Sequence, residues 1–167
     1  MHCPSNVKQK IIGFARLTSE SQRLQSEGKR IIATNGCFDI LHVGHVRYLA
    51  AAKGLGDVLI VGLNGDESVR KLKGPGRPVN REQDRAEVLA AVESVDYVVI
   101  FPEARATNFL AAARPAIYVK GGDYTPETLE AAERGVLEKN GAKIEIIPFE
   151  RGYSTSELLE KIKACEA

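Results

Sequence analysis

The sequence lacks a disulfide framework, because its three cysteines, Cys3, Cys37 and Cys165, are odd in number and irregularly spaced. It also lacks an excess of charge: the net charge of +1 excludes the broad basic field typical of nucleic-acid-binding proteins. No apolar run is long enough to cross a bilayer, and residues 1–10 lack the apolar core of a secretory signal. We therefore expect a cytoplasmic protein that binds small molecules and neither membrane nor nucleic acid.

The chain has no internal repeat or low-complexity tract, and its 167 residues suit a single core. Short apolar runs alternate instead with helical patterns. These patterns predict strands at 30–34, 57–63, 97–100, 116–119 and 144–147, and helices at 17–26, 43–53, 81–93, 104–113, 128–139 and 154–163. Such alternation implies right-handed parallel crossovers, so the expected fold is α/β, with a Rossmann-like, doubly wound, five-stranded parallel sheet.

Apolar positions also predict which helix faces meet this sheet. In the 43–53 helix the expected stripe is Val46, Leu49 and Ala50. In the 81–93 helix it is Val88, Leu89 and Val92. Ligands of such sheets bind at the carboxyl ends of the strands, so the loops that follow strands are expected to carry the function.

The most informative segment, residues 35–45, follows the first strand and reads Asn-Gly-Cys-Phe-Asp-Ile-Leu-His-Val-Gly-His. His42 and His45 are three residues apart at a helix start and so lie on one face. Gly44 allows a phosphate to approach the backbone, and the first-turn amides add positive potential. Such a cradle can stabilise charge on an attacked α-phosphate and on leaving pyrophosphate. The alternatives are surface histidines, or a zinc site with Cys37 that has no convincing fourth ligand.

A basic stretch broken by glycines and prolines lies further along the chain and contains Lys71, Lys73, Arg77, Arg81 and Arg85. The glycines and prolines are typical of a flexible flap, with a solvated loop as the alternative, and Arg85 is the residue expected to face the site. Lys53 is either another phosphate contact or a charge favoured by the helix dipole. Asp66 is either a hydroxyl-binding residue or a helix N-cap.

Two further motifs follow later strands. Residues 120–124 read Lys-Gly-Gly-Asp-Tyr, where the glycines permit close approach to a base or ribose and Asp123 can accept bonds from hydroxyls. A tight turn is the alternative. Ser154 and Thr155 begin the last helix, where their hydroxyls can cap it or contact the β- or γ-phosphate.

Together these motifs resemble the signature of the HxGH nucleotidyltransferase superfamily. The narrower resemblance is to the heptose 1-phosphate adenylyltransferases, the family that includes the adenylyltransferase half of bifunctional ADP-heptose synthases. It rests on residues 35–45, 120–124, Val79-Asn80 with Asp84-Arg85, and Ser154-Thr155, and it extends from about Gly28 to Ile162. It implies an HxGH nucleotidyltransferase domain at 29–167, preceded by an N-terminal helical extension at 1–28.

The resemblance also implies an activity. The family transfers AMP from ATP to D-glycero-β-D-manno-heptose 1-phosphate, which gives pyrophosphate and an ADP-heptose for lipopolysaccharide or a related glycan. Mg²⁺ is the implied cofactor, ATP the co-substrate and a homodimer the implied assembly. The attacking group is the substrate's own phosphate, already ionised at neutral pH, so no strong general base is required.

The roles of individual residues are carried over from the same resemblance. His42 and His45 would hold the triphosphate and stabilise the transition state, and Asp39 would lie near the phosphates and the Mg²⁺ ion. The implied ATP-binding residues are Phe38, Gly44, Lys120, Gly121, Asp123, Ser154 and Thr155. The implied sugar-phosphate residues are Asn35, Gly36, Lys53, Asp66 and Arg85.

The sequence departs from related cytidylyltransferases, which carry Arg-Thr ahead of the Ser-Thr pair. Residues 149–153 read Phe-Glu-Arg-Gly-Tyr instead, which leaves the role of Arg151 open. Cys37 stands where those relatives often have Thr, so no chemistry is assigned to it. A cytidylyltransferase acting on a polyol phosphate such as glycerol 3-phosphate, and a catalytically silent ATP-binding module, are the two competing functions. The sequence fixes neither the base nor the sugar stereochemistry.

Overall fold

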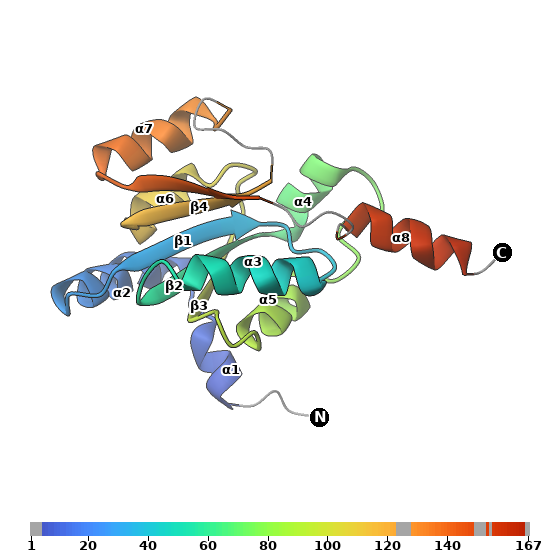
Figure 1. Cartoon of the computed structure of the whole chain (residues 1–167), viewed down its shortest axis with the longest axis horizontal. Helices are drawn as coiled ribbons and strands as arrows, with labels where there is room; N and C mark the ends of the chain where they lie inside the picture. Colours follow the sequence, from blue (N-terminus) through green and yellow to red (C-terminus); the bar gives the residue numbers. More distant parts are fainter. Residues whose placement is uncertain (1–4, 123–127, 149–152, 154, 166–167) are drawn as a thin grey trace.

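The computed structural model describes residues 5–122, 128–148, 153 and 155–165. Five strands form one parallel sheet in the order β3-β2-β1-β4-β5, which confirms the predicted α/β fold (Figure 1). The strands are β1 Ile31–Gly36, β2 Val58–Asn64, β3 Tyr97–Phe101, β4 Ile117–Gly121 and β5 Lys143–Ile147. The helices are α1 Ser5–Lys10, α2 Phe14–Ser26, α3 Val43–Lys53, α4 Asp66–Lys73, α5 Glu82–Ala90, α6 Thr107–Ala113, α7 Ala131–Lys139 and α8 Thr155–Ala164.

The order of the strands reverses at the centre of the sheet. β1 pairs with β2 on one side and with β4 on the other, both in parallel. The chain therefore leaves β1 toward one edge of the sheet and later returns to build the other edge from β4. β1 and β4, which end at Gly36 and Gly121, are paired at this reversal, which is where open α/β sheets bind their ligands.

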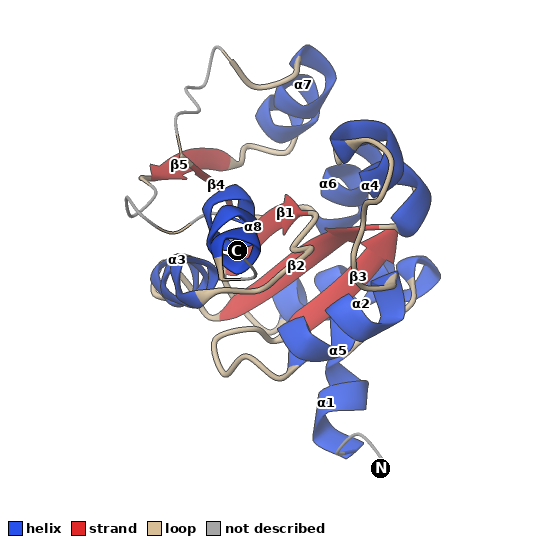
Figure 2. Ribbon diagram, turned by 90° about the vertical axis from the view of Figure 1, so that its right-hand side faces the viewer, coloured by secondary structure: helices blue, strands red, loops and turns tan. Residues whose placement is uncertain are grey.

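Helices cover both faces of the sheet, and each face has its own core (Figure 2). On one face, α2, α6 and α7 contribute Leu17, Phe109 and Leu137. On the other face, α3 and α5 contribute Leu49 and Leu89. Every residue of β2 is buried, as its continuous apolar run predicts for a strand covered on both sides.

The predicted helix faces need correction. Val46 is 41% exposed, Val88 is 51% exposed and Ala50 is exposed as well, whereas Ala52 and Ala90 are buried against the sheet. Leu49 and Leu89 are buried as expected. Small side chains such as Ala52 and Ala90 let a helix backbone approach the strands closely, and the position of the larger apolar residues does not reveal that packing.

The sequence patterns do not predict α1 or α4. The short, highly charged helix α4 buries only Ser68 and Val69, too few residues to give a clear helical period. Because α4 extends to Lys73, the first part of the basic stretch is helical, and the loop proper begins at Gly74.

The N-terminal segment packs onto the sheet. Ile11 forms an isolated parallel bridge with Val98, and the Ile12 amide donates to the Val98 carbonyl over 3.0 Å. Leu17 and Leu24 of α2 belong to the core. The division of the chain at residue 28 stays a prediction. Among the described residues, no helix combines the length and apolar character that crossing a bilayer requires.

Candidate active site

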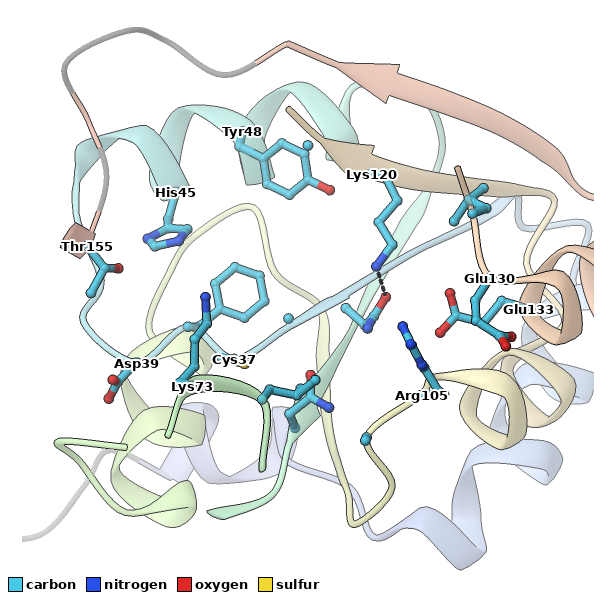
Figure 3. A pocket seen from close by; sticks show the side chains of 18 of the residues that line it. Cys37, Asp39, His45, Tyr48, Lys73, Arg105, Lys120, Glu130, Glu133 and Thr155 are labelled. Carbon is cyan, nitrogen blue, oxygen red and sulfur yellow. Dashed lines mark hydrogen bonds between the residues drawn. The ribbon is translucent and has the colours of Figure 1, made fainter. Parts of the chain in front are cut away.

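A cavity of about 670 Å³ lies at the carboxyl ends of β1 and β4 (Figure 3). The strands end here, and residues of α3, α4, α7 and α8 and of the loops after α4 and β3 complete the walls. The structure therefore gathers predicted site residues that are more than a hundred positions apart in the sequence. Those that line the cavity are Asn35, Gly36, Phe38, Asp39, His45, Lys120, Gly121 and Thr155.

The floor of the cavity joins β1 to β4 through Asn35. Its Oδ1 accepts from the Tyr118 hydroxyl over 2.5 Å and from the Lys120 ammonium over 3.0 Å. Burial lowers the pKa of Lys120, and the nearby carboxylate of Glu133 acts in the opposite direction. The amide of Asn35 thus positions a cation at the point where the strand order reverses.

The two histidines stack at the start of α3. Their ring centroids are 3.9 Å apart, and the planes are inclined by 29°. His42 is the N-cap residue and His45 lies in the first turn, so both histidines stand at the amino end of α3. Burial is the main cause that lowers the pKa of each ring, to about 4 for His45, so both are neutral at pH 7.

Each imidazole leaves one atom without a partner. Within the described part of the chain, the Nδ1 atoms of His42 and His45 are buried and make no hydrogen bond. A buried polar atom without a partner is costly, and such atoms are typical of a site that a ligand completes. Of the two histidines, only His45 lines the cavity. The His42 ring does not line it but stacks on the His45 ring.

Two residues pack closely against the histidine pair, Phe38 and Gly44. Phe38 has φ of 42°, a left-handed conformation that a non-glycine residue adopts only where its surroundings impose it. Its ring lies 5.2 Å from that of His45, centroid to centroid. At Gly44, a Cβ atom would lie 2.9 Å from Cβ of Tyr153 and 3.1 Å from the His42 ring. Gly44 is thus required because a side chain would not fit beside His42 and Tyr153. The sequence suggests a different reason for a glycine here, the close approach of a phosphate to the backbone.

Asp39 is held by the loop that follows α4. Its carboxylate is buried, with 6% of the residue exposed. Oδ2 accepts from the Arg77 guanidinium over 2.6 Å, and Oδ1 accepts from the Val79 amide over 2.7 Å. The predicted flap is therefore closed onto the 35–45 segment by an ion pair and a backbone hydrogen bond.

The role of Asp39 beside a Mg²⁺ ion that arrives with ATP stays a prediction. Magnesium takes oxygen ligands, whereas both carboxylate oxygens here already accept from protein donors, one of them a cation. Within the described residues, no three His, Cys, Asp or Glu side chains gather to hold a metal ion, so Cys37, His42 and His45 do not form the alternative zinc site either. The described residues therefore form no cluster that would hold a metal ion without substrate.

The structure does not place Arg85 in the cavity, where the sequence analysis expects it. It is 2% exposed and lies inside the protein, where the guanidinium donates to the carbonyl oxygens of Cys37 over 2.5 Å and Asn80 over 3.1 Å. Its remaining nitrogen pairs with Asp66 Oδ1 over 2.8 Å. Arg85 and Asp66 therefore bind each other and neither lines the cavity. Arg85 positions the Cys37 to Asp39 loop and does not grip a substrate phosphate.

Lys53 does not line the cavity either. Its Nζ pairs with Asp96 Oδ2 over 2.5 Å and also donates to the Asp57 carbonyl. Asp57 and Asp96 precede β2 and β3, so Lys53 lies at the amino ends of the strands, opposite the cavity. An 11-residue helix separates the two edges, and the last turn of α3 cannot reach the site reached by its first turn.

Other residues of the cavity are absent from the sequence-based set. Tyr48 lines it and is fixed by hydrogen bonds to Thr34 Oγ1 over 2.7 Å and to the Val119 carbonyl over 3.0 Å. Arg105 and Glu133 line it from the loop after β3 and from α7. Position after a strand was an available signal for Arg105, but none existed for Glu133, which reads as an ordinary helix residue. Asp123, Ser154 and Arg151 lie outside the described residues.

The comparisons with known proteins agree with this geometry. A doubly wound sheet with a His-x-Gly-His helix start at its point of reversal defines a nucleotidyltransferase. Residues 33–161 match the cytidylyltransferase-like family, and the chain belongs to that family.

The chain is similar to proteins called bifunctional protein HldE. It is 50% identical over 138 residues to that of Pelobacter propionicus, which covers 83% of this chain and 28% of the relative. It is 47% identical over 161 residues to that of Citrifermentans bemidjiense, which covers 96% of this chain and 33% of the relative. The chain thus spans about a third or less of the length of these relatives.

Solved structures are similar as well. The lipopolysaccharide core biosynthesis protein from Thermoplasma volcanium superposes with a TM-score of 0.61 at 27% identity, over 76% of this chain and 100% of that one. The pantoate-beta-alanine ligase from Francisella tularensis, complexed with beta-gamma ATP and beta-alanine, gives a TM-score of 0.58 at 15% identity, over 94% and 78%. The second likeness shows the fold alone.

Proposed function

We propose that the protein transfers AMP from ATP to D-glycero-β-D-manno-heptose 1-phosphate, which yields ADP-heptose and pyrophosphate for lipopolysaccharide or a related glycan. The observation that carries the proposal is the pair of neutral, stacked histidines whose buried Nδ1 atoms have no partner in the described structure, beside a cavity that also holds Lys120. The similarity to bifunctional HldE proteins over most of the chain supports the choice of substrate.

The reaction needs one bond formed and one broken. An oxygen of the sugar phosphate attacks the α-phosphorus of ATP, and the bond from that phosphorus to the oxygen bridging to the β-phosphate breaks. Negative charge builds on the oxygens of the α-phosphate and on the leaving pyrophosphate. Imidazole N–H groups, the first amides of α3 and the Lys120 ammonium are donors held in place before the reaction, which is the largest source of catalysis in such transfers.

Mg²⁺, cytoplasmic location and assembly belong to the same proposal. Magnesium usually keeps several waters and takes other ligands from substrate phosphates, so we propose that it arrives with ATP. We also propose that the protein works in the cytoplasm as a homodimer. Sedimentation velocity at micromolar concentration should give twice the 18.2 kDa of the chain; a monomer would refute the dimer and leave the chemistry untouched.

A panel of substrates tests the function. ATP, CTP, GTP and UTP are each offered with heptose 1-phosphate or glycerol 3-phosphate, and pyrophosphate release is measured. Release only with ATP and heptose 1-phosphate is the expected result. Pyrophosphate release with CTP and glycerol 3-phosphate would contradict the proposal and indicate a polyol-phosphate cytidylyltransferase. No pyrophosphate release with any pair of substrates would indicate a catalytically silent ATP-binding module.

A further inference from the structure

The parallel sheet divides where its strand order reverses. β1 pairs with β2 along its whole length, and β4 does the same with β5. Between β1 and β4, the register in the described strands ends at Ala33 and Tyr118. Both strands continue beyond this pair, and their last residues, 35–36 and 120–121, line the cavity. The cavity thus begins where the two halves of the sheet separate.

One side chain spans the gap at its base. Tyr48 of α3 donates its hydroxyl to the Val119 carbonyl over 3.0 Å, and the same oxygen lies 2.7 Å from Thr34 Oγ1. Thr34 and Val119 directly follow the last pair of the ladder, and both are fully buried. Figure 3 shows Tyr48 on α3, with its hydroxyl directed toward the strand that carries Lys120. A chain of two hydrogen bonds therefore joins β1 to β4 through Tyr48.

The hydroxyl of Tyr48 has a fixed direction in this bridge. Burial raises the pKa of Tyr48, so the phenol keeps its proton at neutral pH. A phenol has a single proton, which is given to the Val119 carbonyl, so Thr34 is the donor in the other bond. A buried carbonyl that loses its donor is costly, and a phenylalanine ring would fill the same space without replacing that donor. The hydroxyl, and not the ring, is what ties the two strands together.

Each end of the bridge lies beside a group that the proposed reaction uses. Val119 precedes Lys120 on β4, and Tyr48 follows His45 by about one turn of α3. Thr34 lies on β1, which leads directly into the segment that carries both histidines. One hydroxyl thus joins the three elements that carry or lead to the proposed phosphate donors.

We infer that Tyr48 is a positioning residue, whose hydroxyl sets the separation of β1 and β4 and so holds Lys120 at the distance from His45 that AMP transfer requires. The inference rests on the proposed function. Tyr48 acts through these two side chains and not on the reacting atoms. A donor misplaced by about 1 Å can cost ~10²-fold in rate, so a small change in the gap is enough to slow turnover.

Steady-state kinetics of two variants test the bridge from both ends. Tyr48→Phe removes the central hydroxyl, and Thr34→Val removes its donor on β1. Each should lower kcat by ~10-fold or more and change KM for ATP by less than ~3-fold, since the donors remain but are misplaced. The double variant should lose little more than Tyr48→Phe alone, because both changes break one chain of bonds. Thr34→Ser keeps the hydroxyl and should recover most of the loss.

A matched control separates positioning from general stability. Tyr97→Phe removes a hydroxyl that lies 2.7 Å from Glu20 Oε1, at the amino end of β3 and away from the cavity. It should leave kcat at the wild-type value. Equal losses of kcat in Tyr97→Phe and Tyr48→Phe would overturn the inference, because any lost hydroxyl would then have the same effect.

The pKa of Lys120, followed by NMR, supplies a readout independent of turnover. Burial lowers this pKa in the wild type. If loss of the bridge opens the gap to water, Tyr48→Phe should raise the pKa of Lys120 toward its ordinary value of 10.5, and Tyr97→Phe should leave it unchanged. The other groups that act on this ammonium are present in every variant: Glu133, Cys37 and Arg105.

The two readouts distinguish failure of the inference from failure of the proposed function. An unchanged kcat in Tyr48→Phe, or an unchanged pKa of Lys120 in that variant, would overturn the positioning role and leave the proposed function standing. A raised pKa of Lys120 in Tyr48→Phe, with no pyrophosphate release by the wild type, would support the control of the gap by Tyr48 and contradict the proposed function.

Discussion

The imidazole rings of His42 and His45 stack 3.9 Å apart, centroid to centroid, and burial together with the charge of His42 lowers the pKa of His45 to about 4. Two protonated rings at this distance would repel each other, and a half-buried ring loses hydration when charged. The pair is therefore held neutral at the pH at which ATP is fully ionised. Neutral imidazoles can donate to phosphate oxygens without titrating during turnover.

The lowered pKa of His45 predicts a loss of stability on acidification. The unfolded chain binds the proton near the ordinary value of 6.5 and the folded chain only near 4, so this contribution is complete above 6.5 and declines as the pH falls toward 4. Urea unfolding of wild type and His45→Gln at pH 7 and pH 4.5 measures it. The wild type should lose more free energy of unfolding between these two values than the variant. An equal loss in both would show that His45 is not shifted.

Gly44→Ala should damage catalysis through packing. The new Cβ would meet Cβ of Tyr153 at 2.9 Å and the His42 ring at 3.1 Å, so the ring must move out of its stack with His45. We expect kcat to fall by ~10-fold or more, since displaced donors stabilise developing charge poorly. Gly135→Ala is the control: it has nothing within 4 Å and should stabilise its helix by about 0.5–1 kcal/mol with activity intact. Equal activity of both variants would refute the packing role of Gly44.

Arg85→Ala should destabilise the protein, because it breaks a buried network. The variant leaves the carbonyls of Cys37 and Asn80 and the carboxylate of Asp66 without their donor, at a cost of roughly 3 kcal/mol in the free energy of unfolding. The exposed Arg81→Ala should change it by about 0.5 kcal/mol or less. Denaturant unfolding compares them. A higher KM for the sugar phosphate with unchanged stability would instead restore the phosphate-gripping role.

Asp39→Ala should release the loop that follows α4. The substitution removes the acceptor of the Val79 amide and the partner of Arg77, while the rest of the fold is untouched. Hydrogen exchange at the Val79 amide should become faster, since protection depends on local opening. The buried Leu59 amide, which bonds to Asp96, is the internal reference and should not change. Unaltered protection at Val79 would mean that another contact holds the loop.

Much of this fold follows from local patterns. The apolar runs at β1 to β5 are short, well separated and joined by helical periods, so strand number and parallel pairing could be predicted. Helix orientation could not, because Val46 and Val88 mark an apolar face that the sheet does not use. Small residues such as Ala52 and Ala90 face the strands, and that choice depends on how closely two elements approach in three dimensions.

The sequence likewise predicts one part of the candidate site and not the other. Residues 35–45 are contiguous, so their shared location could be predicted from the sequence. The partner of each charged side chain could not be predicted, because it depends on tertiary contacts. Lys53 pairs with Asp96 and Arg85 pairs with Asp66. Glu133 enters the cavity only because α7 packs beside α6, a juxtaposition that no local spacing reveals.

The most direct test of the account follows the α-phosphate. ATP labelled at that position is incubated with heptose 1-phosphate and wild-type protein, and the products are separated. The label should appear in ADP-heptose, with one pyrophosphate released for each sugar nucleotide formed, and His42→Ala or His45→Ala should slow its appearance by ~10²-fold or more, since each removes a preorganised donor. Label that stays in ATP, or wild-type rates in both histidine variants, would contradict the account.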